Sequence, residues 1–374
     1  MSLLSTISIS GEIALVTGGC GQAGYFVVKA LLSDETYSSV HVFSRNPTHS
    51  LQPNVQYHAG SITSESDIAT VISQVKPTVI FHCASPITTG SAKASDFHSV
   101  NITGTNILLS LATKSEYTKV LVYTSSITVV QKPYNLAQET QPYFHLSQDA
   151  RKEFKSQPYP FTKSVADATV LEANSKSLKT CCLRLSTILG THDQQTIPPI
   201  LNATKGKVGF RNFQIGPNIT KVDILSTRNS AKAHLLAAAA LPKNKPGVAG
   251  ELFFITDGQP VRFWDFVHDV YRLADPKNCP RPEDIWIVPT WLVIFLISLG
   301  EWVFLIFTFG YLSPPGLKPY QIRYLTEEAT FSIEKARERL GYEPDDDRET
   351  RMKEAVEWGL NEMDMKRELV RKKE

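Results

Sequence analysis

Two side chains four residues apart could carry proton-transfer chemistry. Tyr159 and Lys163 begin and end the segment YPFTK, whose pattern is helical. Residues at this spacing lie on one face of a helix, so the phenol and the ammonium would be neighbours. A nearby ammonium favours the phenolate form, which would suit Tyr159 to general acid–base work. Because YxxxK also arises by chance, this interpretation needs support from other residues.

Hydroxyl and amide side chains occur at two further places. Ser126 closes the apolar run VLVYTSS, and ligands of open α/β sheets bind at the carboxyl ends of such strands. Asn101 lies in VNITGTNILL, after an earlier apolar run, and an isolated asparagine there more often caps a helix. The sequence therefore offers a tyrosine, a lysine, a serine and an asparagine as candidate site residues.

A glycine-rich stretch near the start of the chain, TGGCGQAG at 17–24, could hold a dinucleotide. An apolar run precedes it at 13–16, and a segment of helical period follows it at 25–32. In that setting Gly18 permits a tight turn, Gly21 lets the backbone approach a pyrophosphate, and Gly24 lets the helix pack on the strand. The helix N-terminus adds unpaired N–H groups and a partial positive charge. The stretch predicts a nucleotide cofactor.

The type of nucleotide depends on residues about twenty positions beyond the loop. An acid there would bind the ribose 2′-OH of NAD, whereas this chain has Phe43-Ser44-Arg45. Ser44 and Arg45 suit a 2′-phosphate, since a guanidinium can donate two parallel charge-assisted hydrogen bonds. We therefore expect a preference for NADP. NAD is the alternative if Arg45 is only a solvated loop cation.

The elements that must position these residues alternate between strand and helix patterns. Helical patterns separate the apolar runs, as at 64–75, where Ser64 and Asp67 have the spacing of a capping box. This alternation predicts an α/β fold, a Rossmann-like doubly wound parallel sheet with helices on both faces. The predicted strands are Ile13–Thr17, Val40–Ser44, Val55–Ala59, Thr78–Cys83, Val120–Thr124 and Thr180–Arg184.

Composition narrows the classes of partner. In 374 residues, 39 basic and 37 acidic side chains nearly balance, so nucleic acid is not an expected partner. The five cysteines show no CxxC or metal-ligand spacing, so we expect reduced, buried thiols on the cytosolic side of any membrane and no metal site. The N-terminus lacks a basic region and a long apolar core, so no signal peptide is predicted.

Taken in order, these motifs resemble the extended short-chain dehydrogenase/reductase superfamily. VTGGCG, FHCASP, VNITGTNILL, VYTSSITVV and YPFTK are similar to motifs of the 3β-hydroxysteroid dehydrogenase/isomerase family. The resemblance continues through LRLSTILGTHD at 183–193, VDILSTRNSAKAHLLAAAAL, GELFFITDGQPVRFWDF and SIEKARERLGYEP, in which Gly341 would stop a closing helix. It covers about residues 11–345. Within the family, the chain looks most like the sterol-4α-carboxylate 3-dehydrogenases (decarboxylating).

The resemblance implies roles for individual residues. Tyr159 would be the catalytic acid/base, and Lys163 would favour its ionisation and hold the nicotinamide ribose. Ser126, or less favourably Ser125, would bind the reacting oxygen, and Asn101 would support a proton relay. Family members often carry an acid where Ser44 stands, which bears on the nucleotide preference. They often carry Asp where Ser61 stands, next to the expected adenine site, which bears on the strength of binding. The residues implied to bind the cofactor are Gly18, Gly21, Gln22, Gly24, Ser44, Arg45, Ser61, Ile62, Ala84 and Lys163.

The activity implied by the resemblance is NAD(P)-dependent oxidation of a 3β-hydroxyl group on an apolar substrate, a sterol or triterpenoid, with loss of a C4 carboxyl group. The alternatives are another activity of the superfamily (a 3β-hydroxysteroid dehydrogenase/isomerase, a reductase or an epimerase) and a non-catalytic NAD(P)-binding protein. The resemblance also allows a homodimer.

The most apolar segment, WLVIFLISLGEWVFLIFTF at 291–309, could just reach across a bilayer. Glu301 near its middle would be costly in a plain span. Three interpretations stay open: a span, partial (monotopic) insertion into the membrane surface, and a soluble lid over an apolar substrate. We expect partial insertion, and therefore attachment to the endoplasmic reticulum membrane with the catalytic domain in the cytosol.

These patterns divide the chain into three predicted parts. Residues 11–262 would form the NAD(P)-binding Rossmann-like domain with substrate-binding insertions. Residues 263–345 would form a smaller C-terminal substrate-binding and membrane-associated part. Residues 346–374 would form a charged C-terminal helix or tail.

Overall fold

A seven-stranded parallel sheet forms the centre of the computed structural model, which describes residues 11–89, 92–148, 157–204, 210–243, 245–308, 322 and 326–371. Its strand order is β12-β7-β5-β4-β1-β2-β3. The order reverses between β1 and β4, the switch point at which nucleotides bind in such sheets. The strands are β1 (Glu12–Thr17), β2 (Tyr37–Ser44), β3 (Gln56–Ala59), β4 (Val79–His82), β5 (Val120–Ser126), β7 (Lys179–Leu185) and β12 (Glu251–Ile255).

The predicted fold class is confirmed, and six of these strands coincide with the predicted ones. β2 begins three residues earlier than predicted, and β5 continues to Ser126. The seventh strand, β12, pairs in parallel with β7 at the edge of the sheet. The sequence analysis had noted its residues only as part of a family motif. β1, β4, β5 and β7 are buried over nearly their whole length, as strands covered on both faces must be.

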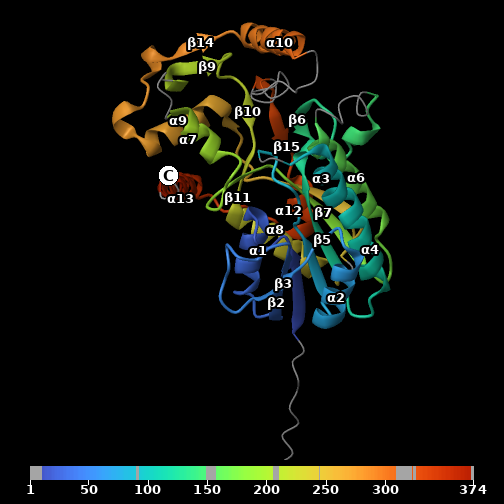
Figure 1. Ribbon diagram of the computed structural model, residues 1–374. Helices are drawn as coiled ribbons and strands as arrows, with labels where there is room; N and C mark the ends of the chain where they lie inside the picture. Colours follow the sequence, from blue (N-terminus) through green and yellow to red (C-terminus); the bar gives the residue numbers. More distant parts are fainter. Residues whose placement is uncertain are drawn as a thin grey trace, which may run out of the picture.

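Helices cover both faces of the sheet (Figure 1). One face carries α1 (Gln22–Leu31), α8 (Thr227–Ala240) and α12 (Glu334–Leu340), whose apolar residues join β1, β4 and β5 in one core cluster. The other face carries α2 (Glu65–Val75), α4 (Thr105–Lys114) and α6 (Pro158–Glu172), with a second core cluster beneath them. The helix predicted at 25–32 begins earlier, at Gln22, so the glycine loop leads directly into its first turn.

Two predicted helix boundaries can be checked against the structure. Ser64 caps α2, because its hydroxyl accepts a hydrogen bond from the N–H of Asp67 at 3.3 Å. The carboxylate of Asp67 does not complete a capping box. It accepts instead from the N–H of Ser61, at 2.9 Å. Gly341 ends α12 with a φ of +69°, which confirms the predicted helix stop.

A smaller part stands on the carboxyl side of the sheet. Its core joins β8 (Thr187–Leu189), α7 (Ile197–Thr204), β11 (Ile224–Ser226), α9 (Phe263–Ala274) and α13 (Arg348–Arg371). Beside it lie a mixed sheet of β6 (Tyr134–Ala137), β10 (Lys221–Val222), β13 (Val261–Arg262) and β15 (Ala329–Phe331), and the pair β9 (Phe213–Ile215) and β14 (Trp286–Val288). This core cluster contains residues of all three predicted parts, 11–262, 263–345 and 346–374. The predicted C-terminal helix is present as α13, and Met352, Ala355 and Val356 of its first half are buried in this core.

The apolar segment forms α10 (Thr290–Phe307) at the end of the molecule farthest from α2 and β2 (Figure 1). It is long and apolar enough to cross a membrane, by length and composition. None of its residues is buried, and Trp291, Trp302 and Phe307 are 69%, 68% and 80% exposed. The last predicted residue, Phe309, lies outside the described residues. Burial against the described part of the chain, as a closed lid would require, is not observed.

All five cysteines are free. Cys20, Cys181 and Cys182 are buried, as predicted. Cys83 and Cys279 are only partly buried, which corrects the expectation that every thiol is buried. Cys83 follows β4 at the carboxyl edge of the sheet, where strands give way to loops and packing is less complete.

Candidate active site

Lys163 lies in the interior, with 2% of its surface exposed. Its ammonium donates to the carbonyl oxygen of Thr124 at 2.7 Å and to the hydroxyl of Tyr123 at 3.2 Å. The ammonium also stands 4.6 Å from the centre of the Tyr123 ring. Burial lowers the pKa of Lys163 from 10.5 to about 8. A buried lysine is thus held at the end of β5 by a strand carbonyl and a phenol.

Tyr159 stands one turn before Lys163 on α6, as the YxxxK spacing predicts. Its ring is partly buried and meets Phe97 edge to face, with the ring centres 5.9 Å apart. Phe97 ends the short helix α3 (Ala94–Phe97). The phenol is also close enough to raise the pKa of Tyr123, although burial is the larger cause of that shift. Helix and ring contact together fix Tyr159 beside the strand that carries Ser126.

Two adjacent serines at the end of β5 point in opposite directions, as alternation along a strand requires. Ser125 donates to the carboxylate of Asp167, beneath α6. Ser126 caps a 3-10 helix (Ile127–Val129), and its hydroxyl lies 3.0 Å from that of Thr128 and accepts from the Thr128 N–H at 3.3 Å. α6 packs against this 3-10 helix. Ser125 is therefore committed to the interior, whereas Ser126 lies at the carboxyl edge.

Asn101 is buried, with 1% of its surface exposed, inside a π-helix (His98–Gly104). Its amide nitrogen donates to the hydroxyl of Thr162 at 3.0 Å, and its carbonyl oxygen accepts from that of Ser85 at 2.9 Å. The residue is not a helix cap, which the sequence had left as the alternative. π-Helical turns occur often at functional sites, because they redirect a side chain. Here the turn aims Asn101 at α6 and at the loop after β4.

Beneath these residues lie buried polar groups that the sequence analysis did not identify. His82, at the end of β4, bonds Thr17 at 2.7 Å through one ring nitrogen and Thr105 at 2.9 Å through the other. Burial, and secondarily the charge of Lys163, lowers the pKa of His82 to about 3. The imidazole is thus neutral and ties β1, β4 and α4 together under the site. In the sequence, His82 could have been noticed as a histidine at the end of an apolar strand.

An ion pair lies between α6 and β7. Arg184 donates to Asp167 at 3.0 and 3.3 Å, and both side chains are fully buried. Tyr143 donates to the same carboxylate at 2.9 Å, and its ring lies 5.0 Å from the guanidinium carbon. Asp167 follows Lys163 by four residues, so the i,i+4 rule could have placed it on the Lys163 face of α6. This rule could not identify the partner of Asp167, because Arg184 lies on β7 and not on α6.

The glycine loop fits a phosphate group at the start of α1. Gly18 has a φ of +72°, and a Cβ atom there would lie 2.7 Å from the Cα of Ala84. A Cβ at Gly24 would lie 2.4 Å from the carbonyl oxygen of Gly18. A Cβ at Gly21, by contrast, would meet only that carbonyl, at 3.4 Å, so Gly21 faces open space before the helix N-terminus. Gly18 and Gly24 are thus needed for close packing, and Gly21 leaves room for a pyrophosphate.

The other residues predicted to bind cofactor lie around this loop. Ser44 ends β2 and forms a hydrogen bond with Cys20 of the glycine loop. Arg45 follows it, is exposed, and has no ion pair among the described residues. Gln22 opens α1, with its side-chain nitrogen 3.5 Å from the carbonyl oxygen of Thr191. Ile62 is buried against Gly104, at the end of the π-helix, and follows Ser61. The fold thus gathers at one sheet edge residues spread over the first half of the chain.

Comparison with known sequences extends over most of the chain. Residues 15–280 match the model of the 3-beta hydroxysteroid dehydrogenase/isomerase family. The sterol-4-alpha-carboxylate 3-dehydrogenase erg26, decarboxylating, of Schizosaccharomyces pombe is 30% identical over 345 residues, 91% of this chain and 95% of that protein. The 3beta-hydroxysteroid-dehydrogenase/decarboxylase isoform 1 of Arabidopsis thaliana is 28% identical over 352 residues, 88% of this chain and 75% of that protein.

Solved structures share the fold. The dTDP-glucose 4,6-dehydratase of Bacillus anthracis, solved in complex with NAD, has a TM-score of 0.64 at 22% identity and covers 92% of this chain and 95% of its own. The enzyme WbmH of Bordetella bronchiseptica, in complex with NAD+, has a TM-score of 0.67 at 15% identity, with 93% and 98% covered. At these identities the likeness concerns the architecture alone.

Proposed function

The chain belongs to the 3β-hydroxysteroid dehydrogenase/isomerase family of NAD(P)-dependent oxidoreductases acting on CH–OH groups, and on that premise we propose that it oxidises the 3β-hydroxyl of a sterol or triterpenoid that carries a carboxyl group at C4. The observation that carries the proposal is the position of Lys163. It lies one turn after Tyr159 on α6 and donates a hydrogen bond to the Thr124 carbonyl of β5, the strand that ends at Ser126. The names of the fungal and plant relatives support the substrate class.

In this proposal each residue has a role that its surroundings suit. Tyr159 takes the proton of the secondary alcohol as general base, with its phenolate form favoured by the ammonium of Lys163. Ser126 donates a hydrogen bond to the reacting oxygen. Asn101, which is hydrogen-bonded to Thr162 on α6, supports the passage of the proton away from the tyrosine. A bound nicotinamide nucleotide accepts the hydride that leaves the carbinol carbon.

Decarboxylation needs no additional catalytic group. Oxidation of the 3β-hydroxyl places a ketone next to the carbon that bears the carboxylate, which makes the product a β-keto acid. The carbon–carbon bond to the carboxylate then breaks, and its electron pair passes into the new carbonyl as an enolate. Carbon dioxide leaves, and the enolate is protonated. In this proposal the residues that bound the alcohol oxygen, Ser126 and Tyr159, also stabilise that enolate oxygen.

Product analysis tests this function. Purified protein is incubated with 4-carboxysterols and with 3β-hydroxysteroids lacking the carboxyl group, each with NAD and with NADP, and the products are analysed by mass spectrometry. For the first group, the proposal predicts a 3-ketone that is lighter than its substrate by one carbon dioxide and two hydrogen atoms. Tyr159→Phe is the matched control. Oxidation only of substrates without the carboxyl group would contradict decarboxylation, and no turnover by wild type on either group would refute the function.

The nucleotide preference is proposed to be for NADP and to depend on Arg45. The side chain is exposed beside Ser44 at the end of β2 and has no ion pair among the described residues that would compete for its guanidinium. A charge-assisted Arg–phosphate pair contributes on the order of 1.5–3 kcal/mol. Arg45→Ala should therefore weaken the binding of the NADP form and leave the binding of the NAD form unchanged, as measured by the fluorescence of the reduced nucleotides. Arg262→Ala, an exposed arginine remote from the site, is the control. Equal affinity of wild type for both nucleotides would contradict the proposal.

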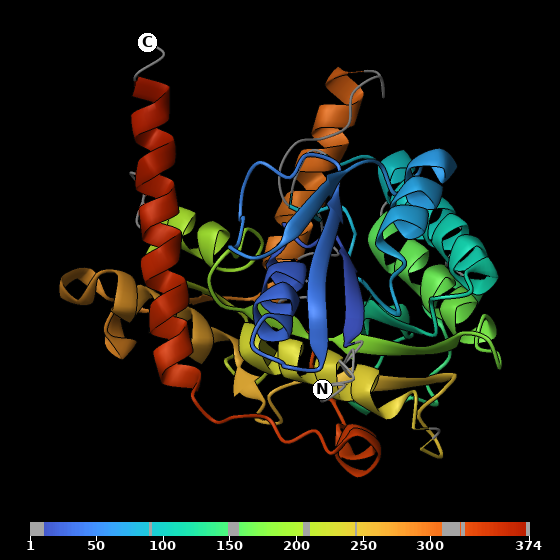
Figure 2. The same cartoon turned by 90° about the horizontal axis from the view of Figure 1, so that it is seen from below.

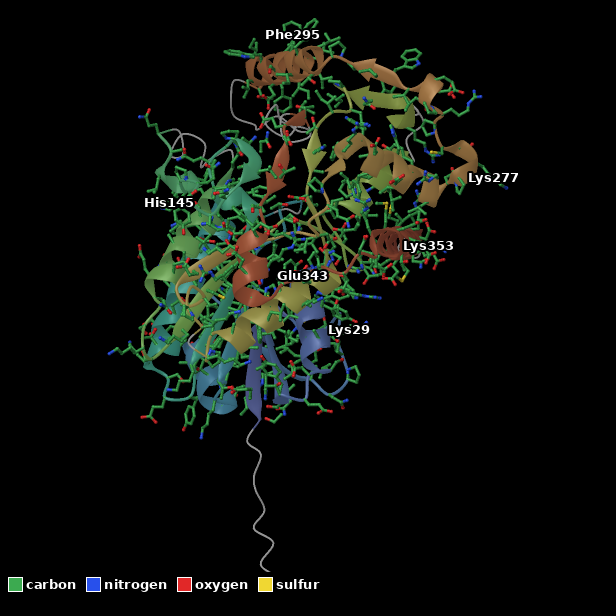
Figure 3. All side chains as sticks on the ribbon, turned by 180° about the vertical axis from the view of Figure 1, so that it is seen from behind. Lys29, His145, Lys277, Phe295, Glu343 and Lys353 are labelled. Carbon is green, nitrogen blue, oxygen red and sulfur yellow. The ribbon has the colours of Figure 1, made fainter. Side chains whose placement is uncertain are left out.

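Attachment to the endoplasmic reticulum membrane is proposed to occur through α10. Exposed Phe295 points away from the sheet domain (Figure 3), and Trp286 and Ile287 of the adjoining β14 are also more than half exposed. Soluble proteins rarely leave so much continuous apolar surface in water. Glu301 disfavours a plain span, so the helix would lie in the interface with its apolar residues inserted. An apolar substrate partitions into the same bilayer, which would bring it close to the enzyme.

Fractionation of cells tests the attachment. Wild type and a Phe295→Asp/Ile306→Asp double variant, which keeps α10 but charges its exposed surface, are separated into pellet and high-speed supernatant without detergent. Wild type should pellet with membranes, and the variant should shift to the supernatant. Tyr117→Asp, at an exposed position in the turn before β5, is the control. Wild type in the supernatant would favour the soluble lid instead. A homodimer stays a prediction of the family resemblance.

A further inference from the structure

The segment 191–195, between β8 and α7, crosses the switch point of the large sheet. It contacts loops that follow three different strands. Gln22 of the glycine loop reaches the carbonyl oxygen of Thr191, and Gln195 accepts from the N–H of Thr88, after β4, at 3.0 Å. Asp193 anchors the segment, because its buried carboxylate accepts from the backbone N–H groups that open α7. The segment therefore lies over the edge at which a nucleotide would enter.

This segment contains His192, an imidazole that contacts two aromatic rings from distant parts of the chain. The centre of the Tyr25 ring, in the first turn of α1, lies 4.1 Å from that of His192 with a tilt of 30°. The centre of the Trp358 ring lies 5.6 Å from that of His192 with a tilt of 31°. Burial is the main cause that lowers the pKa of His192, so the ring is neutral at pH 7. Three rings from three distant parts of the chain thus form one cluster.

His192 is also bonded to the loop that follows Arg45. Its Nδ1 atom lies 3.2 Å from the hydroxyl of Ser50. Both residues have positive φ, +61° for His192 and +53° for Ser50, which is unusual for residues other than glycine. Strained residues of this kind persist where the surrounding structure determines them strongly, and they gather at ligand clamps. The same loop is tied to α1, because Gln52 donates to the carbonyl oxygen of Tyr25 at 2.9 Å.

One ring of the cluster belongs to the C-terminal helix. Trp358 lies on α13, which runs past α1 in Figure 2 and packs against α7 and α9. Lys29 of α1 and Lys353 of α13 are on the same side of the molecule in Figure 3. A cavity of about 180 Å³ beside the cluster is lined by Ile87 of the loop after β4, by Asp193 and by Trp358. The C-terminal helix therefore reaches the loops of the nucleotide edge through Trp358 and His192.

We propose that His192 is a positioning residue for the nucleotide site: through its ring contacts with Tyr25 and Trp358, it holds the 191–195 segment and the C-terminal helix across the mouth of that site. The inference rests on the proposed use of a nicotinamide nucleotide. A nucleotide that lies along the glycine loop must then pass this fastened segment to leave. α13, far from the reacting groups, thereby sets how long the nucleotide stays bound.

Nucleotide binding to the full-length protein tests the inference without substrate. NADH and NADPH are titrated by fluorescence, and their dissociation is followed by stopped-flow mixing. His192→Ala should raise the dissociation constant about tenfold, a change of about 1.4 kcal/mol, mostly through a faster dissociation rate. His192→Phe keeps a planar ring and should restore much of the loss. Trp358→Leu removes only the indole ring and should also speed dissociation.

A matched control separates positioning from general destabilisation. His268 is a partly buried histidine that lies 6.2 Å from both Trp264 and Tyr271 on α9, away from the nucleotide edge. His268→Ala should lower the thermal midpoint and leave nucleotide dissociation as in wild type. If His192→Ala does not fold, Trp358→Leu decides. Dissociation rates within about twofold of wild type in the folded variants would overturn the inference. If wild type binds neither nucleotide, the proposed function itself fails.

Discussion

Replacing Asp167 by asparagine should lower the free energy of unfolding by more than most single substitutions do. The carboxylate is fully buried and accepts hydrogen bonds from Arg184, Ser125 and Tyr143. Asparagine keeps the size of the side chain but removes its charge. Arg184 then stays in the interior as an uncompensated cation, and its Nη1 atom already has no partner among the described residues. The substitution therefore isolates the electrostatic part of the interaction.

The magnitude follows from the burial. Removing one partner of a buried ion pair costs about 3–5 kcal/mol, because the remaining charge has lost both water and its counter-ion. The entropy of unfolding is about 2.1 cal/mol/K per residue, or roughly 0.8 kcal/mol/K for 374 residues. The thermal midpoint should therefore fall by about 4–6 °C. Arg184→Met should cost less, since the carboxyl keeps Ser125 and Tyr143 and can take up a proton, whereas a guanidinium cannot lose one.

Thermal and urea unfolding of the two variants measure these costs. Asp269→Asn is the control, because Asp269 pairs with Arg272 at 2.7 Å on the surface, where such a pair contributes about 0.2–1 kcal/mol. A midpoint for Asp167→Asn within about 1 °C of wild type would refute the reasoning. A larger loss in Arg184→Met than in Asp167→Asn would refute the assignment of the cost to the stranded guanidinium.

Three further outcomes are expected. Tyr159→Phe should lose about 10²–10⁴-fold in kcat while nucleotide titration shows unchanged binding, and a kcat near that of wild type would exclude Tyr159 as the acid–base group. Because burial lowers the pKa of Lys163 to about 8, the unfolded chain binds more protons between about pH 8 and 10.5. Wild type should therefore gain stability relative to Lys163→Met as pH rises through that window in thermal scans, and a constant difference would contradict this. Gly18→Ala, whose methyl group would meet the backbone of Ala84, should cost more in urea unfolding than Gly341→Ala, which has the same positive φ but open space. Equal costs would show that the clash relaxes.

Much of the Rossmann-like half could be predicted from local patterns. Six of the seven strands and the glycine loop coincide with their predicted positions, because a buried parallel strand must be a continuous apolar run and a strand–turn–helix must have glycine at its crossings. The family was recognisable from the order of its motifs. The roles of Tyr159, Lys163, Ser126 and Asn101 stay predictions until they are measured, although the fold brings them to one sheet edge.

The alternation of strand residues could also have separated Ser125 from Ser126, since adjacent side chains leave a strand on opposite faces. The spacing of Lys163 and Asp167 likewise indicated a shared helix face. The partner of Asp167, in contrast, could not be predicted from the sequence. Arg184 is adjacent to Ser125 only because β7 pairs with β5 in a particular register, which no local pattern specifies.

The sequence by itself thus determined the local elements and the types of residue at the site, because helix and strand periods and turn chemistry depend on neighbours along the chain. Only the tertiary structure decided which elements the C-terminal third packs against. Tyr25 and Trp358, more than three hundred residues apart, meet through His192. Contacts of this kind depend on how whole elements pack, and that packing is decided by the burial of all their apolar surfaces together.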